Sequence, residues 1–344
     1  MLSTTIIATV FVFGLLVFFH ELGHFMTAKW TGMRVDEFAI GFGPKIASYR
    51  KGETLYSWRL IPLGGFNKIA GMDPDEKQDE RSFQSKPLAS RILVIIAGSM
   101  MNFILPIVLF MIVFLASGVD EASTQPVLGT LLPNRPAATS GFNEGDRIVS
   151  INGQSIESWK QFVAIIQASA NQTLDITIER DGQTQIKTLV PEFDAKANRA
   201  VVGVMPIIHH HVAGVFEAIV LAGKQTYFVA GAMLTGIAQM ITGQVAAEVA
   251  GPIGVAQLTG QVAQMGLIPL LQFAAFLSIN LGLINLFPVP VLDGGHVVTL
   301  LVEGLRGKPL SHRSTYLVQM IGMALLLMLM IFATMKDIVR LNLF

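Results

Sequence analysis

The chain has no cysteine among its 344 residues, and it has few charged ones. Without thiols it can form no disulfide bond and offers no thiolate ligand, so a metal ion would have to be held by histidine and carboxylate side chains. Charged residues make up 14% of the chain, and 24 basic residues balance 24 acidic ones. A chain with no net charge and no basic patch gives no support to nucleic-acid binding.

Apolar residues are abundant instead, at 52% of the chain with a mean hydropathy of +0.56. Such values are typical of membrane proteins that also carry water-exposed mass. A helix of about 20 apolar residues crosses a bilayer, and four stretches of the sequence reach that length. We therefore predict a polytopic α-helical membrane protein with four transmembrane helices, at residues 1–28, 92–119, 265–295 and 314–336.

Two apolar stretches could also be something other than a transmembrane span. The first run lacks the basic residues that open a signal peptide, so we expect it to be retained as a membrane span. Residues 225–243 are rich in glycine, alanine and glutamine, and charged residues precede them. This composition favours an interfacial or partly buried amphipathic helix over a fifth span.

The first run contains the sequence His20-Glu21-Leu22-Gly23-His24, with no other charge before Lys29. On a helix the two histidines lie one turn apart on the same face, where both can reach one zinc ion, and Glu21 is close enough to act on water at that ion. The alternative is a pair of core histidines with a capped glutamate. That alternative is costly, because lipid penalises ionisable groups that have no partner.

A second polar group follows the third apolar run, where the chain reads Asn285-Leu-Phe-Pro288-Val-Pro290-Val-Leu-Asp293-Gly. Two prolines spaced by one residue end a helix, so we expect Asp293 on a non-helical stretch. With the two histidines, Asp293 would make three protein ligands and leave a fourth position open, as in catalytic zinc sites. The alternative is a kinked helix that ends in an Asp-Gly turn.

The distribution of charge predicts the topology. Residues 29–91 hold 11 basic and 8 acidic side chains, whereas residues 120–199 hold 7 basic and 10 acidic ones. The positive-inside rule then places residues 29–91 in the cytoplasm and residues 120–199 outside it. With four spans, Asp293 returns to the membrane depth of the two histidines near the cytoplasmic side. A fifth span would move it to the opposite face.

The two motifs together resemble the site-2 protease family of intramembrane zinc metalloproteases, and within it the RseP-like branch of regulator-of-sigma-E proteases. Segments 61–68, 97–102 and 251–254 are also similar to that branch. The resemblance implies zinc ligands at His20, His24 and Asp293, a catalytic base at Glu21, and substrate binding by Asn285. Asn280 is a second candidate for substrate binding. The chain departs from the branch at Ser99, where proline is common.

Residues 125–207 are expected to form an extracytoplasmic α+β domain. Strand-like stretches end in the turn sequences Asn152-Gly153 and Asp181-Gly182, and residues 159–166 place apolar side chains on one helical face. The pattern resembles a circularly permuted bacterial PDZ domain, with room for one copy, whose peptide-binding loop would be residues 202–205. Such a domain would capture a peptide or limit access to the membrane site. Residues 208–264 would link it to the membrane through amphipathic helices.

Residues 29–91 are predicted to contain a membrane-associated β-hairpin. The segment from Phe42 to Met72 is rich in glycine and includes Gly64 and Gly65. The edge of such a hairpin could pair with an unwound substrate strand, which makes these two glycines candidate substrate-binding residues. The alternative is an ordinary cytoplasmic loop.

The leading prediction is an intramembrane zinc endopeptidase of the bacterial inner membrane. A helix hides its peptide bonds, so the substrate must be unwound locally before cleavage. The family resemblance implies single-span transmembrane substrates, such as anti-sigma factors or remnant signal peptides, in regulated intramembrane proteolysis. A membrane metal-ion transporter and an inactive scaffold that displays a PDZ domain are the alternatives.

Overall fold

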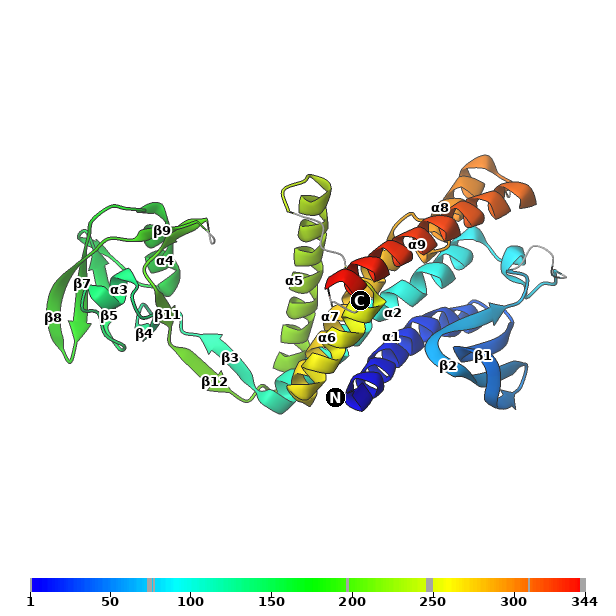
Figure 1. Ribbon diagram of the computed structural model, residues 1–344, viewed down its shortest axis with the longest axis horizontal. Helices are drawn as coiled ribbons and strands as arrows, with labels where there is room; N and C mark the ends of the chain where they lie inside the picture. The colour runs from blue at the N-terminus through cyan, green and yellow to red at the C-terminus, as the bar shows by residue number, and fades with distance from the viewer. Residues whose placement is uncertain are drawn as a thin grey trace. The chain divides into compact units, whose positions relative to one another are not determined.

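A computed structural model describes residues 2–72, 76, 78–195, 198–245, 250–308 and 310–340. The chain forms two compact units. Residues 1–117 and 214–344 form the helical unit, and residues 118–213 form the β-rich unit. The β-rich unit is therefore an insertion between two halves of the helical unit (Figure 1).

The helical unit contains seven helices of 13 residues or more in the part of the chain that the structure describes. They are α1 (Leu2–Trp30), α2 (Leu88–Ser117), α5 (Val215–Ile241), α6 (Pro252–Gln264), α7 (Leu267–Leu286), α8 (Asp293–Arg306) and α9 (His312–Arg340). Four of them, α1, α2, α7 and α9, are long and apolar enough to cross a membrane. α5 covers residues 225–241 of the stretch 225–243 and does not meet that standard.

The core of the helical unit lies among α1, α2 and α7. Leu16, Leu105 and Ile279 are each at most 2% exposed there. Small residues let α1 and α2 approach closely, as is common between membrane helices. At Gly23 an added Cβ would lie 2.3 Å from the carbonyl oxygen of Ala97, so this contact requires glycine.

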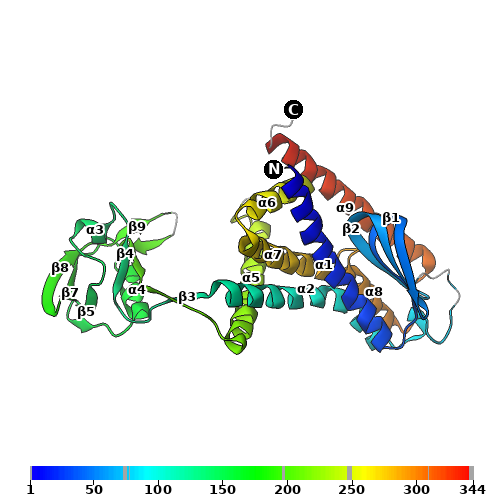
Figure 2. The same cartoon turned by 90° about the horizontal axis from the view of Figure 1, so that it is seen from below.

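Two long strands, β1 (Val35–Lys51) and β2 (Thr54–Ile69), form the predicted hairpin beside α1 (Figures 1 and 2). The strand pairing is more extensive than in the simple two-stranded hairpin that the sequence predicts. Phe38 pairs with both Asn67 and Tyr56, so the first half of β1 lies between two segments of β2. Residues 65–69 of β2 form an outer segment of this sheet, and they lie against α1.

The helices differ in their bounds from the four predicted spans, and two of these differences have a clear physical reason. α2 begins at Leu88 rather than residue 92, because Arg91 is buried within it and donates to Glu303 of α8 at 2.6 Å. The predicted span 265–295 is two helices. α7 ends at Leu286, and α8 begins at Asp293. The expectation of a non-helical Asp293 is wrong, because a carboxylate is favourable in the first turn of a new helix.

The β-rich unit is a sheet and a helix around their own core. Its four-stranded sheet has the order β6 (Gln154–Ser155), β5 (Arg147–Ile151), β7 (Leu174–Arg180) and β8 (Gln183–Leu189). The predicted turns after β5 and β7 are confirmed by positive φ at both residues of each pair. Helix α4 (Trp159–Ala168) buries Phe162 and Ile166 against the sheet.

The remaining described elements of this unit are three short strand pairs and one single-turn helix. They are β3 (Val119–Ala122) with β12 (Ile208–His211), β4 (Leu128–Leu131) with β11 (Val204–Pro206), β9 (Glu192–Asp194) with β10 (Arg199–Val201), and the single-turn helix α3 (Pro136–Thr139). The β3–β12 pair extends the unit beyond the predicted limits of 125 and 207. The predicted linker therefore begins after this pair, because residues 208–211 are a strand.

Candidate metal centre

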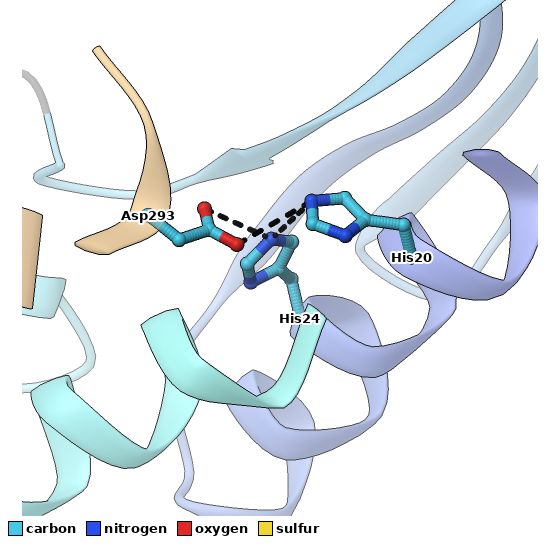
Figure 3. Close-up of side chains that lie close together, drawn as sticks. All are labelled: His20, His24 and Asp293. Atoms are coloured by element: carbon cyan, nitrogen blue, oxygen red, sulfur yellow. Dashed lines mark hydrogen bonds and ion pairs between the residues drawn. The ribbon is translucent and has the colours of Figure 1, made fainter. Parts of the chain in front are cut away.

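Three ionisable side chains from distant parts of the sequence converge inside the helical unit (Figure 3). His20 and His24 project from successive turns of α1, and their Nε2 atoms lie 3.2 Å apart. Asp293 approaches from the start of α8, with Oδ2 3.5 Å from His20 Nε2 and Oδ1 3.6 Å from His24 Nε2. The three side chains are only 11–15% exposed.

These distances fit a tetrahedral zinc site. Ligand atoms about 2.0–2.1 Å from a tetrahedral ion lie roughly 3.3 Å from one another. The two histidine nitrogens lie 3.2 Å apart, and each lies near one oxygen of the Asp293 carboxylate, His20 at 3.5 Å from Oδ2 and His24 at 3.6 Å from Oδ1. One ligand atom from each residue lies within 4.8 Å of the other two. Two imidazole nitrogens and one carboxylate are ligands that zinc accepts, and the set leaves one position open. His20, His24 and Asp293 are therefore the residues that would hold the ion.

Neighbouring groups on α2 orient two of these side chains. His24 donates through Nδ1 to the carbonyl oxygen of Val94 at 2.8 Å, which leaves the lone pair of Nε2 directed at the centre. Ser99 donates through its hydroxyl to Oδ2 of Asp293 at 3.0 Å. At Gly98 an added Cβ would lie 2.2 Å from His24 Nε2, so only glycine leaves room for the imidazole.

Asn102 is the corresponding neighbour of His20. Its side-chain nitrogen lies 3.2 Å from His20 Nδ1, while its oxygen is buried without a partner in the described part of the chain. A histidine that binds a cation through Nε2 carries its proton on Nδ1 and needs an acceptor there. If the Asn102 amide is rotated by 180°, its oxygen accepts the hydrogen bond from the Nδ1–H of His20. Asn102 therefore suits a His20 that binds an ion through Nε2.

Glu21 lies beside the centre on the face of α1 that meets the hairpin. Asn67 of β2 donates to the Glu21 carboxylate at 2.8 Å and to its backbone oxygen at 2.7 Å. An added Cβ at Gly65 would lie 3.0 Å from Glu21 Cγ. The hairpin thus confines the acidic side chain that the sequence predicts as a base.

The other predicted site residues lie outside this cluster. Asn280 and Asn285 are partly buried on α7, and no hydrogen bond joins either side chain to another described residue. Their predicted substrate contacts stay predictions. Gly64 has φ +105°, and an added Cβ would lie 2.1 Å from the Phe42 ring, so its backbone conformation and its packing both require glycine.

Sequence reasoning missed Asn67 and gave no role to Ser99. Both residues act through contacts between segments that are distant in the sequence: Asn67 lies 46 residues from Glu21, and Ser99 lies 194 residues from Asp293. The available signal was weak. Each is a polar residue in an otherwise apolar or glycine-rich stretch, but the sequence does not say which partner it meets.

Part of the chain is similar to the PDZ domain of an SdrC-like protein from Listeria monocytogenes, with 17% identity over 25% of this chain and 93% of that one and a TM-score of 0.22. The corresponding domain from Listeria innocua is 25% identical over 26% of this chain and 100% of that one, also with a TM-score of 0.22.

The chain is also similar over nearly its whole length to bacterial metalloproteases. The chain is 35% identical to "Regulator of sigma-W protease RasP" of Bacillus subtilis, over 99% of this chain and 100% of that protein. It is 36% identical to a putative zinc metalloprotease of Clostridium acetobutylicum, over 97% of each chain. The model of peptidase family M50 matches residues 8–329, which include all three residues of the metal centre and Glu21. The chain therefore belongs to peptidase family M50.

Proposed function

We propose that the chain is an intramembrane zinc endopeptidase whose active site consists of His20, Glu21, His24 and Asp293. The observation that carries this proposal is the convergence of three ligand side chains, with one ligand atom of each within 4.8 Å of the others, in an apolar helical unit. Membership of a peptidase family supports the same reaction. An inactive scaffold that only displays a PDZ domain would not require these ligand side chains to converge.

The residues around the centre have separate tasks in peptide hydrolysis. Zinc in such a centre supplies Lewis acidity, which makes water a nucleophile near neutral pH. Glu21 takes a proton from the attacking water and passes it to the amine of the leaving segment. His20, His24 and Asp293 hold the ion, and Ser99 fixes the orientation of the Asp293 carboxylate. Asn285 would bind the substrate backbone near the scissile bond.

The proposed substrates are single-span membrane proteins, including anti-sigma factors and remnant signal peptides. The name of the Bacillus subtilis relative supports a role in the regulation of a sigma factor. A helical substrate must be extended before its peptide bond reaches the centre. Residues 65–69 of β2 suit this step, because they form an outer segment of the sheet directly beside Glu21. Gly64 and Gly65 would then contact the substrate strand.

The proposed location is the bacterial inner membrane, with α1, α2, α7 and α9 as spans. The charge bias of residues 29–91 and 120–199 supports a hairpin and active site near the cytoplasmic side and an extracytoplasmic β-rich unit. Exposed apolar side chains at the hairpin support its association with lipid, among them Ile46, Trp58 and Leu60 at 60–67% exposure.

For the β-rich unit we propose a PDZ domain that limits access of substrates to the centre. The unit has a cavity of about 990 Å³ beside α4, lined by Trp159, Phe162 and residues 199–206, which supports peptide capture as the means of this control. These include residues 202–205, which the sequence predicts as the peptide-binding loop. A bound peptide would lie as an added strand between this loop and α4.

A metal-removal experiment tests the proposal. The purified protein is incubated with a single-span substrate in proteoliposomes, before and after the metal is removed with a chelator. We expect cleavage to stop with removal and to return when one equivalent of zinc is added. The variant Asp293→Ala should lose both zinc and cleavage. Cleavage that continues in metal-free protein would overturn the proposal.

The transporter alternative makes a different prediction for the same vesicles. It requires zinc to cross the membrane, which a fluorescent indicator inside the vesicles would report. Among the described residues, His20, His24 and Asp293 form the one cluster of metal-ligand side chains, and the run 314–335 of α9 contains no charge. We therefore expect no zinc flux above that of empty vesicles.

A further inference from the structure

Asn67 makes an unusual pair of contacts with α1. It lies in the outer segment 65–69 of β2, and its backbone pairs with Phe38. Its side-chain nitrogen donates to the Glu21 backbone oxygen at 2.7 Å and to Glu21 Oε2 at 2.8 Å. A single amide group thus holds both the main chain and the carboxylate of the proposed base.

The chemistry of these contacts fixes the orientation of the Asn67 amide. Both atoms that it faces are acceptors, so only its NH₂ group can meet them. Its oxygen Oδ1 is buried and has no partner in the described part of the chain. A buried oxygen without a partner is unfavourable for folding, and an apolar β-branched residue would suit a strand better. Packing alone therefore does not account for asparagine at this position.

Gly65 makes the approach of Asn67 possible. The two residues lie on the same face of the strand, because side chains alternate along it. An added Cβ at Gly65 would lie 2.7 Å from the Ala39 carbonyl oxygen and 3.0 Å from Glu21 Cγ. The absence of a side chain brings the strand close enough for the amide to reach α1. Glu21 is confined between the metal centre and this segment.

We propose that Asn67 is a positioning residue, whose amide holds the Glu21 carboxylate in place for proton transfer. The proposal rests on the proposed role of Glu21 as the base. A carboxylate that is already oriented needs no reorganisation during the reaction, so Asn67 acts on the chemical step. Since no hydrogen bond joins Asn67 to His20, His24 or Asp293 in the described part of the chain, we expect zinc binding not to depend on it.

The test is the variant Asn67→Val, which removes both donors and keeps a good strand residue. Cleavage of a single-span substrate is measured in proteoliposomes with the full chain. We expect kcat to fall by about 10- to 100-fold, while KM and zinc content stay at wild-type values and the unfolding temperature does not fall. Asn67→Gln restores an amide donor and should recover part of the lost kcat.

Thr54→Val is the matched control on the same strand. It removes another buried side-chain donor, whose hydroxyl binds the Val35 carbonyl oxygen at 2.7 Å. We expect its kcat to equal that of the wild type. A loss of zinc or a lower unfolding temperature in Asn67→Val, in step with the loss of kcat, would show a structural role and overturn the proposal.

Glu21→Gln separates this proposal from the proposed function. If Glu21→Gln is inactive and Asn67→Val retains the wild-type kcat, Asn67 is not a positioning residue, and the proposed function stands. If Glu21→Gln cleaves at the wild-type rate, the proposed base is wrong, and both proposals fall.

Discussion

At the scale of single residues, the metal centre depends on neighbours that the protein supplies from one helix. α2 contributes the Val94 carbonyl to His24, the Ser99 hydroxyl to Asp293 and the Asn102 amide to His20. Each contact sets the direction of one ligand. Such supporting groups commonly change metal affinity by about 10- to 100-fold when they are removed.

Ser99→Ala tests this support directly. Ser99 is fully buried, and alanine fits its place in a helix, so the change removes only the hydroxyl. We expect zinc affinity to fall by about 10-fold or more because Asp293 loses its donor. Competition with a fluorescent chelator measures it. Thr259→Val, which deletes an equally buried hydroxyl on α6, should leave the affinity unchanged. Equal affinities for wild type and Ser99→Ala would refute this role.

The convergence of His20, His24 and Asp293 could be predicted from the sequence, whereas the groups that surround them could not. The spacing of His20 and His24 on one helix is a local property, so periodicity is enough to place them together. Asp293 was predicted from the four-span topology and from the family resemblance. The position of Asn67 against Glu21 depends on the bends of β1 and β2, and no local pattern of residues determines that contact.

At the scale of elements, the hairpin forms hydrogen bonds with α1 at more than one point. Asn67 contacts Glu21, and Glu53 in the turn between the strands accepts hydrogen bonds from Arg81 at 2.7 and 2.8 Å and from Lys29 at 2.5 Å. The hydrogen bonds from Arg81 and then Lys29 lower the pKa of Glu53 from 4.5 to about 2. The ionised carboxylate therefore stabilises the folded hairpin.

The pH dependence of this contact has a definite sign. Because the pKa of Glu53 is lower in the folded state, its stabilisation is complete above pH 4.5 and is lost as the pH falls towards 2. We expect Glu53→Gln to unfold at a lower temperature than wild type at pH 7. This difference should shrink between pH 4.5 and pH 2, as thermal unfolding in detergent would measure. A difference that is constant over this range would contradict the assignment.

The residues at which helices begin and end were predicted less accurately than the presence of the helices. Pro288 and Pro290 correctly indicate the end of α7, but they carry no information on where the next helix begins. The charge of Arg91 suggests the edge of a span, whereas the structure pairs it with Glu303 inside the helical unit. A charge marks a boundary only when it has no partner in the protein, and the sequence does not name the partner.

At the scale of the whole molecule, the chain consists of two units with separate cores. The β-rich unit buries Ile148, Ile151, Ile176 and Ile178 to 2% exposure or less within residues 118–213. Its first and last strands, β3 and β12, pair with each other, so the two ends of the insertion lie together. An insertion of this kind does not need the rest of the chain to complete its core.

Residues 118–213 are therefore expected to fold when produced alone. Thermal unfolding followed by circular dichroism should show one cooperative transition, and a two-dimensional NMR spectrum should be well dispersed. The remaining chain, with a short glycine–serine linker in place of residues 118–213, should still bind one zinc ion, since no residue of the centre lies in the insertion. A non-cooperative, poorly dispersed fragment would show that the two units depend on each other.

The central claim is that His20, His24 and Asp293 hold a zinc ion beside which Glu21 transfers protons. Its most direct test measures zinc content and cleavage on one preparation of Glu21→Gln in proteoliposomes. The account predicts one zinc ion per chain together with a loss of cleavage of at least about 100-fold. Cleavage at the wild-type rate by the zinc-loaded variant would contradict it.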